Sequence, residues 1–433
     1  MRSSILAAAI VIALGSSISF SAAAQTGTSS ELDELKAQLA ALQAKVAELE
    51  ERTDAQSDIN VGTQENIDKI TTGSTKVETK GGMKLTSADG NFEASLGGRI
   101  HFDAYAFDRD NVSTTGTTEF RRARLTLAGK AFGWEYKMEQ DFSAGTTTDG
   151  FRDVFIAKKA LGGKVTIGHF KPYRSMEELT SSNEITMMER PFSSATGLFN
   201  GRQFVQGVGY MKAGDNYTVG ATVFNTRSAS GPRNEGAGAA GRVTYAPINN
   251  DNSTLHFGVS ASTENANAGS ANMTAAANYA GRRGPSQTIA TTTGASGDSV
   301  DSVGLEFAGA FGPMFFQSEY ANATFNRPNG SQDIDTFYVM GSWMLTGEHK
   351  AYKSANGVFG APKVGAKGAW ELTARYDTIE NKDVNNLEAS SSTVGLNYYF
   401  NPNVRLMFNY TKGDNEFTGD KTGQYAVRTQ LSF

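Results

Sequence analysis

Basic side chains at alternate positions are the residues of this chain best suited to chemistry. Arg122 and Arg124 lie two residues apart, and Leu125 and Leu127 occupy the opposite face of the same stretch. A guanidinium group is always charged and presents a planar fork of donors, which suits phosphate and other oxyanions. These groups are therefore candidates for reversible binding of anions, although the residues by themselves support only a charged, wet face. Alternation assigns these basic residues to polar faces: Arg99, Arg122, Arg124, Lys130, Lys137, Arg242, Arg375, Arg405 and Arg428.

Acidic residues on the same polar faces are about as many, and they leave a second interpretation open. Arginines that pair with these acids would stiffen a wall of the protein and would not bind a solute. Arg122 and Arg124, which precede the acidic stretch 135–141, are candidates for such pairing. The acids concerned are Asp103, Glu135, Glu139, Asp141, Glu306, Glu319, Glu371 and Asp377.

The segment 172–201 mixes charged residues with apolar ones such as Ile185, Met188 and Phe192. This mixture favours packing against a wall, whereas a solvated loop would be less apolar. Loops that fold into a channel set its selectivity, so we expect a constriction loop here; an ordinary outer loop is the alternative. The candidate residues at this loop are Lys171, Arg174, Glu178, Ser181, Ser182, Glu189 and Arg190.

Other kinds of chemistry find little support in the composition. The chain has 433 residues, no cysteine and only four histidines, which are scattered without metal-ligand spacing. A serine-nucleophile motif and a phosphate-cradling glycine loop are both missing. The sequence pI of about 5.6 argues against a general nucleic-acid binder. We therefore expect no enzyme activity, no cofactor and no metal site.

The elements that position these side chains are β-strands. From about residue 83 onward the chain alternates apolar and polar residues with period two, and clusters of Gly, Asn, Asp and Ser separate the stretches. Several stretches reach about ten residues, the length that a tilted strand needs to cross a bilayer. The sixteen candidate strands are 93–106, 117–132, 133–143, 149–159, 163–171, 202–213, 215–226, 237–246, 253–263, 301–311, 313–325, 333–345, 367–378, 390–400, 402–412 and 422–433.

Short turns and long polar loops alternate between these strands, as in an outer-membrane barrel. Aromatic residues recur near strand ends, as at Trp134, Trp370 and Tyr410, which suits the girdles of such a barrel. The last strand places Tyr425, Val427, Leu431 and Phe433 on one face and Arg428 on the other. The sequence thus predicts an all-β transmembrane antiparallel barrel of about 16 strands, with a soluble all-β fold as the alternative. The connection 346–366 is too long for its place among the short turns, so it is either decorated or hides a hairpin.

The N-terminal region predicts different structures. Residues 1–24 have the basic start, apolar run and A-x-A exit of a secretory signal. Residues 31–52 show an a/d seam that begins at Leu32 and Leu35, which favours a coiled coil with copies of the chain over a helix packed elsewhere. The expected organisation is a signal peptide at 1–24, a periplasmic coiled-coil segment at 25–52, a linker at 53–80 and a barrel at 81–433.

Several spaced motifs resemble the phosphate-selective porin O and P family, outer-membrane porins of Gram-negative bacteria. They include residues 118–125 with 134–137 and 141–142, then 168–172 with 178–182 and 188–190. Residues 370–376 and 397–405 resemble the C-terminal part of the family. The resemblance implies a porin for small anions, phosphate or polyphosphate, with an arginine ladder in its lumen.

We therefore expect a water-filled channel for passive diffusion across the bacterial outer membrane. The expected partners are small phosphate-like anions, outer-membrane lipid and two further copies of the chain in a homotrimer, with the N-terminal segment in the periplasm. A less selective porin for other small hydrophilic solutes, or a structural protein that tethers the envelope, are the alternatives.

Overall fold

The alternating stretches of the sequence form β-strands, and the leucine seam forms a helix. The computed structural model describes residues 29–79, 82–145, 150–195, 204–226, 236–267 and 270–433. The predicted signal peptide lies outside these described residues. Two units are distinct, one up to Ser74 and one from Thr75 to Phe433, and each is described by itself.

The described part of the first unit, from Ser29, forms the helix α2 (Ser29–Thr72), which is longer than the sequence pattern predicts. The helix was expected to end near Arg52 and to be followed by a linker, but it continues through the polar stretch. Side chains one turn apart support this part, as Gln56 donates to Asn60 (3.2 Å) and Gln64 to Asp68 (2.9 Å). The leucines of the seam are exposed, Leu35 by 65%. Among the described residues, no helix combines the length and the apolar character required to cross a membrane.

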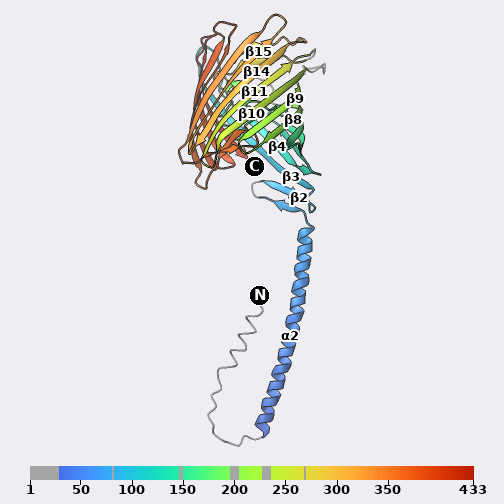
Figure 1. Ribbon diagram of the computed structural model, residues 1–433. Coiled ribbons are helices and arrows are strands. Elements are labelled where there is room, and N and C mark those ends of the chain that lie inside the picture. The colour runs from blue at the N-terminus through green and yellow to red at the C-terminus, as the bar shows by residue number, and fades with distance from the viewer. Residues whose placement is uncertain (1–28, 80–81, 146–149, 196–203, 227–235, 268–269) are drawn as a thin grey trace. The chain divides into compact units, whose positions relative to one another are not determined.

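Sixteen antiparallel strands of the second unit close into a barrel, which confirms the predicted fold class (Figure 1). Closure occurs where the last strand pairs with the first, Arg428 opposite Asp103. Two short strands, β1 (Lys76–Glu78) and β2 (Met83–Thr86), extend the sheet beside the first barrel strand. The barrel strands are β3 (Phe92–Asp108), β4 (Thr117–Ala131), β5 (Trp134–Asp141), β6 (Phe151–Ala160), β7 (Gly163–Phe170), β8 (Val205–Ala213), β9 (Tyr217–Asn225), β10 (Ala237–Asn249), β11 (Ser253–Asn265), β14 (Ser299–Phe311), β15 (Met314–Asn326), β16 (Gln332–Met344), β19 (Ala369–Asn381), β20 (Glu388–Asn401), β21 (Val404–Asn415) and β22 (Gly423–Ser432).

The two ends of the barrel differ in their connections. We call one end the turn rim, because it carries two-residue turns such as Phe132–Gly133 and Leu161–Gly162. Both residues of each turn have positive φ, 52° and 80° in the first and 54° and 76° in the second, which matches the twist of hairpin strands. The other end, the loop rim, carries the longer connections, among them 171–204 and 266–298.

The long connection on the turn rim is a decorated turn, which settles the question left open by the sequence. It contains the small hairpin β17 (Lys350–Lys353) and β18 (Val358–Pro362), and neither strand belongs to the barrel sheet. A second small hairpin, β12 (Thr274–Ala277) and β13 (Gln287–Thr291), lies in the loop 266–298.

The two faces of each barrel strand carry the residue types that alternation predicts. On β22, Tyr425 and Val427 are exposed, whereas Arg428 and Gln430 are buried inside the barrel. Aromatic side chains pair on the outer surface near both ends of the barrel. Near the turn rim, Trp370 and Tyr398 have ring centroids 4.5 Å apart. Near the loop rim, Tyr410 and Tyr425 lie 4.7 Å apart. The outer face therefore suits lipid with interfacial girdles.

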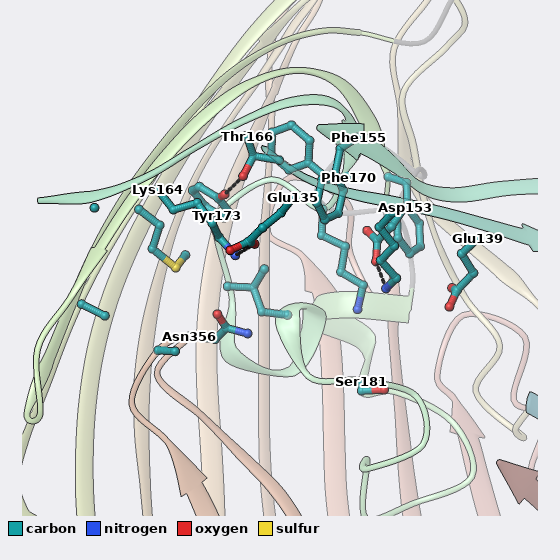
Figure 2. Close-up of a pocket in the computed structure, with 18 of the residues that line it drawn as sticks. Glu135, Glu139, Asp153, Phe155, Lys164, Thr166, Phe170, Tyr173, Ser181 and Asn356 are labelled. Carbon is teal, nitrogen blue, oxygen red and sulfur yellow. Dashed lines mark hydrogen bonds and ion pairs between the residues drawn. The ribbon is translucent and has the colours of Figure 1, made fainter. Parts of the chain in front are cut away.

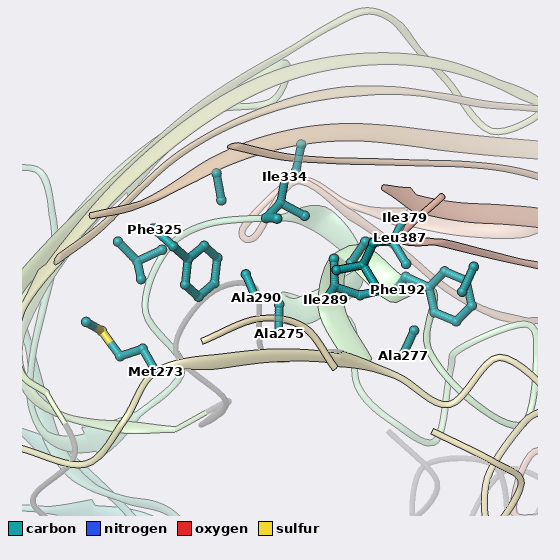
Figure 3. Close-up of a cluster of buried hydrophobic side chains, with 14 of the residues drawn as sticks. Phe192, Met273, Ala275, Ala277, Ile289, Ala290, Phe325, Ile334, Ile379 and Leu387 are labelled. Atoms are coloured by element: carbon teal, nitrogen blue, oxygen red, sulfur yellow. The ribbon is translucent and has the colours of Figure 1, made fainter. Parts of the chain in front are cut away.

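Inward loops fill one side of the lumen with apolar side chains. Met273 and Ile289, from the loop 266–298, pack against Phe325, Ile334 and Ile379 of the wall strands β15, β16 and β19 (Figure 3). Closer to the turn rim, Met176 and Met187 share a cluster with Phe315 of β15 and Phe359 of β18. Close apolar packing excludes water, so a polar path has to run along the opposite side of the barrel, over β3–β9.

Candidate functional site

The segment that follows β7 folds into the barrel, and most of its residues from Tyr173 to Ser193 are buried. It contains two short helical turns, α3 (Met176–Leu179) and α4 (Phe192–Ala195). Ser175 caps α3 by accepting the Glu178 N–H (3.2 Å), and it adopts φ 50° to do so. The Glu319 carboxylate of β15 accepts the N–H groups of Met176 (2.8 Å) and Glu177 (3.1 Å). We call residues 171–195 the inner loop.

Wall arginines hold the backbone of the inner loop. Arg405 donates to the Ile185 carbonyl oxygen (3.0 Å), Arg428 to that of Met188, and Arg375 to that of Glu189 (2.8 Å). Buried carbonyl groups need such donors, because an unpaired one costs free energy. Three of the predicted anion-binding arginines therefore use donors to position this loop.

Buried acids neutralise several of the same arginines, as the second interpretation of the sequence expected. Arg428 contacts Asp103 (2.6 Å) and Glu189 (2.8 Å), and the exposed fractions of Arg428 and Asp103 are both 0%. Arg242 pairs with Glu306 at 2.7 Å and also donates to the carbonyl oxygens of Asn356 and Gly357 (each 2.7 Å). These pairs tie the wall, the inner loop and the β17–β18 hairpin together.

Arg174 forms the corresponding link to β11. Its guanidinium contacts Glu264 (2.6 Å), Ser262 (2.9 Å) and the loop residue Glu178 (3.3 Å). Arg174 and Glu178 are thus part of the loop's attachment to the wall. Arg174 and Glu178 are not among the residues that line the cavity presented below.

Arg121 is an inward-facing arginine that the alternation argument missed. The β3–β4 ladder pairs His101 with Arg122 but Phe102 with Phe120, so β4 carries one extra residue at this point. This bulge lets Arg121 and Arg122 both turn inward, although they are neighbours in sequence. Arg121 donates to both oxygens of Glu189 (2.8 and 2.9 Å). Three arginines within four residues, which strict alternation cannot place on one face, were the available signal.

Arg122 occupies a separate buried position beside the first strand. Its Nη1 donates to Nδ1 of His101 (3.4 Å), and His101 Nε2 lies 3.1 Å from the Asn183 side-chain oxygen. Among the described residues, its Nε has no hydrogen-bond partner. Arg122 therefore contacts the inner loop through His101.

A cavity of about 920 Å³ lies between the inner loop and the inner faces of β3–β8 (Figure 2). Its lining has three acidic and seven basic side chains, an excess of positive charge. The acids are Glu135, Glu139 and Asp153, and the basic residues are Arg99, Arg124, Lys137, Lys159, Lys164, Lys171 and Arg190. Ser181 and Ser182 of the inner loop also line it, and Arg99 donates to Ser182 (2.9 Å).

The strand register orders the basic residues along the cavity. Lys159 and Lys164 pair beside the Leu161–Gly162 turn, and Lys137 follows, opposite Phe155. Farther from the turn rim, Arg99 of β3 pairs with Arg124 of β4. The cavity therefore carries lysines near the turn rim and arginines deeper in the barrel.

Nearby acids balance part of this charge. Glu139 bridges Arg99 (3.0 Å) and Arg124 (2.9 Å), and Lys137 contacts Asp153 (2.5 Å). Lys171 and Arg190, by contrast, donate to uncharged backbone carbonyls. Lys171 contacts the carbonyl oxygens of Glu178 (2.5 Å) and Thr180 (3.1 Å), and Arg190 also donates to that of Thr180 (2.6 Å). Because carbonyl groups carry no formal charge, they do not neutralise the positive charges of Lys171 and Arg190.

Two titratable groups of the inner loop have lowered pKa values, but this disfavours the charge of one and favours the charge of the other. Burial and the charge of Arg190 lower the pKa of Lys171 well below its ordinary value. Burial alone would raise the pKa of Glu189, but Arg121 and Arg428 hold it well below the usual range. Glu189 is therefore an anion over the whole neutral range, whereas the charge of Lys171 is sensitive to its surroundings.

The predicted residues thus fall into two groups. The cavity brings together Arg99, Arg124, Lys137, Lys171, Ser181, Ser182 and Arg190. The remaining candidates lie elsewhere. Those at the inner loop and its anchors are Arg122, Arg174, Glu178, Glu189, Arg375, Arg405 and Arg428. Arg242 holds the β17–β18 hairpin, and Lys130 is exposed on β4 close to the turn rim. Lys159 and Lys164 were missed, although their parity with Ala157 and Thr166 could have placed them inside.

Comparisons with known proteins agree with this architecture. A family model described as phosphate-selective porin O and P matches residues 94–433, which are the barrel. The chain belongs to this family. Porin O of Pseudomonas aeruginosa is 29% identical over 407 residues, which cover 82% of this chain and 92% of that protein.

Solved structures show the same fold at lower identity. An anion-selective porin from Comamonas acidovorans has a TM-score of 0.54 and 13% identity, covering 79% of this chain and 100% of that chain. A loop-deletion mutant of OmpT from Vibrio cholerae has a TM-score of 0.53 and 15% identity, with coverage of 79% and 100%. This porin is therefore a bacterial outer-membrane protein whose family and fold are those of a channel.

Proposed function

We propose that this porin passes small anions by passive diffusion and that phosphate or polyphosphate is its preferred inorganic solute. The observation that carries the proposal is the cavity, where seven basic side chains outnumber three acidic ones. An anion that enters from the turn rim meets Lys159 and Lys164 first and Arg99 and Arg124 later. Several weak sites in succession make entry favourable and still allow exit.

Phosphate suits the deeper part of this cavity. Ser182, Lys171 and Arg190 offer hydroxyl, ammonium and guanidinium donors on the inner loop, while Arg99 offers a guanidinium from the wall. Charge-assisted hydrogen bonds to oxyanions are about twice as strong as neutral ones. Membership of the phosphate-selective porin O and P family supports the same solute. The alternative is a general anion porin that uses the same charges without preferring phosphate.

Reversal potentials in planar lipid bilayers test the anion preference. Under a KCl gradient we expect chloride to be more permeant than potassium, and an equal or cation-preferring channel would contradict the proposal. Millimolar phosphate should then reduce the chloride current. A chloride current that phosphate leaves unchanged would support the general anion porin.

Two adjacent lysines provide a matched pair of variants. Lys159 faces the cavity, whereas Lys158 faces outward with its ammonium over the Trp134 ring at 5.1 Å. A unit charge about 7 Å from the ion path in water is worth about 0.6 kcal/mol, roughly a factor of three in local anion concentration. Lys159→Gln should therefore lower the anion/cation permeability ratio about two- to threefold, and Lys158→Gln should leave it unchanged. If both variants change the permeability ratio equally, the cavity does not lie on the ion path.

We also propose that α2 assembles the chain into a homotrimer through a coiled coil in the periplasm. Its seam residues Leu32, Leu35, Leu39 and Leu42 are exposed, and an apolar seam of this kind needs a partner helix in water. Deleting residues 31–52 should lower the trimer content in sedimentation experiments while single channels still conduct. A trimer that persists undiminished would refute this role. A cysteine introduced at the N-terminal end of α2 tests the periplasmic location. A reagent that stays outside the cell should not label it, and labelling by that reagent would contradict the proposal.

A further inference from the structure

The cavity has an aromatic wall beside its basic residues. Phe155 is on the inner face of β6, half-buried and directly opposite Lys137 in the strand register. Phe170, Tyr173 and Phe204 also line the cavity but are buried, and the rings of Phe170 and Tyr173 are 5.8 Å apart. In Figure 2, Phe155, Phe170 and Tyr173 lie along the wall side of the cavity, and Ser181 lies across from them on the inner loop.

Cations of the cavity lie against these rings. The Lys171 ammonium, which lines the cavity, is 5.6 Å from the centroid of the Phe204 ring. The Arg152 guanidinium, which does not line the cavity, is 5.8 Å from the same centroid. The positive charges that attract an anion are thus placed next to an apolar surface that donates no hydrogen bond to it. A small hydrated inorganic anion gains little from this surface, because aromatic rings cannot replace its water. An anion with an apolar body gains on both sides, since its charge meets the cations and its body covers the rings.

We propose that this cavity is a binding site for small aromatic anions, in which a phosphate or carboxylate head is attached to a ring. The head group meets Lys171, Arg190 and Ser182, and the ring packs on Phe155 and its aromatic neighbours. The volume of about 920 Å³ is in the range of small-molecule sites and accommodates such a solute with water around its head. The proposal deepens the proposed anion channel and depends on it.

Phenyl phosphate and inorganic phosphate form the matched probes, because at pH 8 both are mainly dianions and they differ by one ring. Each is titrated against the chloride current of the full-length channel in bilayers. Covering one aromatic face should lower the half-inhibitory concentration of phenyl phosphate about tenfold relative to inorganic phosphate. Equal concentrations, or weaker inhibition by phenyl phosphate, would overturn the proposal. Benzoate and acetate, a second matched pair, should show the same order if the ring decides binding.

Variants of Phe155 assign the effect to this wall. Phe155→Ala should reduce the advantage of phenyl phosphate to about threefold or less and leave inhibition by inorganic phosphate unchanged, whereas Phe155→Tyr should retain it. Phe120→Ala is the control for barrel assembly, because Phe120 is exposed on the outer face of β4. An advantage that survives Phe155→Ala in full would place the ring elsewhere and refute the assignment.

The reversal potential in KCl separates this inference from the proposed function. A channel without anion preference contradicts the proposed function itself. A channel that prefers chloride to potassium, but binds phenyl phosphate no better than phosphate, keeps the proposed function and refutes only the aromatic site.

Discussion

Replacing Arg428 with methionine tests whether the buried arginines hold the inner loop or guide anions. Arg428 makes two hydrogen bonds to Asp103 (2.7 and 2.6 Å), one to Glu189 (2.8 Å) and one to the Met188 carbonyl oxygen. Methionine fills much of the same volume but donates none of these bonds. Asp103, whose exposed fraction is 0%, then remains as a buried charge that keeps one hydrogen bond from Tyr105 (2.6 Å).

Breaking a buried ion pair by removing one partner costs about 3–5 kcal/mol. Arg428→Met should therefore lower the free energy of unfolding by about this amount. Urea unfolding of the protein in lipid vesicles measures it, and Trp134, Trp343 and Trp370, the three tryptophans of the chain, all report on barrel strands. The double variant Arg428→Met with Asp103→Leu removes both charges, so it should recover most of the loss.

Channel recordings of the same variant measure the second consequence. The inner loop loses one anchor at Met188, so open-channel current noise should increase. Arg428 does not line the cavity, so the reversal potential in KCl should stay unchanged. A stability loss below about 1 kcal/mol, or a reversal potential that shifts as far as in Lys159→Gln, would refute the reasoning.

Three further predictions concern the inner loop and its supports. Arg121→Gln removes two hydrogen bonds to the Glu189 carboxylate and should destabilise the barrel by about 1.5–3 kcal/mol in the same urea assay, whereas loss of an unpaired arginine would cost far less. Because burial lowers the pKa of Lys171, its ammonium group is charged at low pH and loses its charge at a pH below the pKa of an ordinary lysine. The anion/cation permeability ratio should therefore fall as the pH rises through that range. Lys171→Arg should abolish this fall, because a guanidinium group stays charged. Replacing residues 350–362 with a short Gly-Ser turn removes the β17–β18 hairpin, which lines the cavity through Asn356 and whose carbonyl oxygens accept hydrogen bonds from Arg242. Because the hairpin then no longer occupies the lumen, single-channel conductance should rise. An unchanged conductance would show that the hairpin does not narrow the ion path.

The fold could be predicted almost completely from local patterns. Period-two alternation depends only on which face of a strand meets lipid, so it identified the strands of the barrel to within a few residues of their ends. The same rule placed Arg428 inside and Tyr425 outside. It did not extend to the helix, because the polar stretch after Arg52 has no apolar period, and hydrogen bonds one turn apart extend α2 to Thr72.

For the regular parts of the strands, the sequence by itself determined which side chains face the lumen, because the pleat of a strand sends successive residues to opposite faces. It did not determine what those side chains do there. Arg99 and Arg405 look alike in the sequence, yet one lines the cavity and the other donates to the Ile185 carbonyl oxygen. Only the tertiary structure decides this, because the partner of a lumen arginine is set by where the inner loop, the loop 266–298 and the β17–β18 hairpin come to lie. Even the inward turn of Arg121 depends on a bulge in the pairing of β3 with β4, which no single strand encodes.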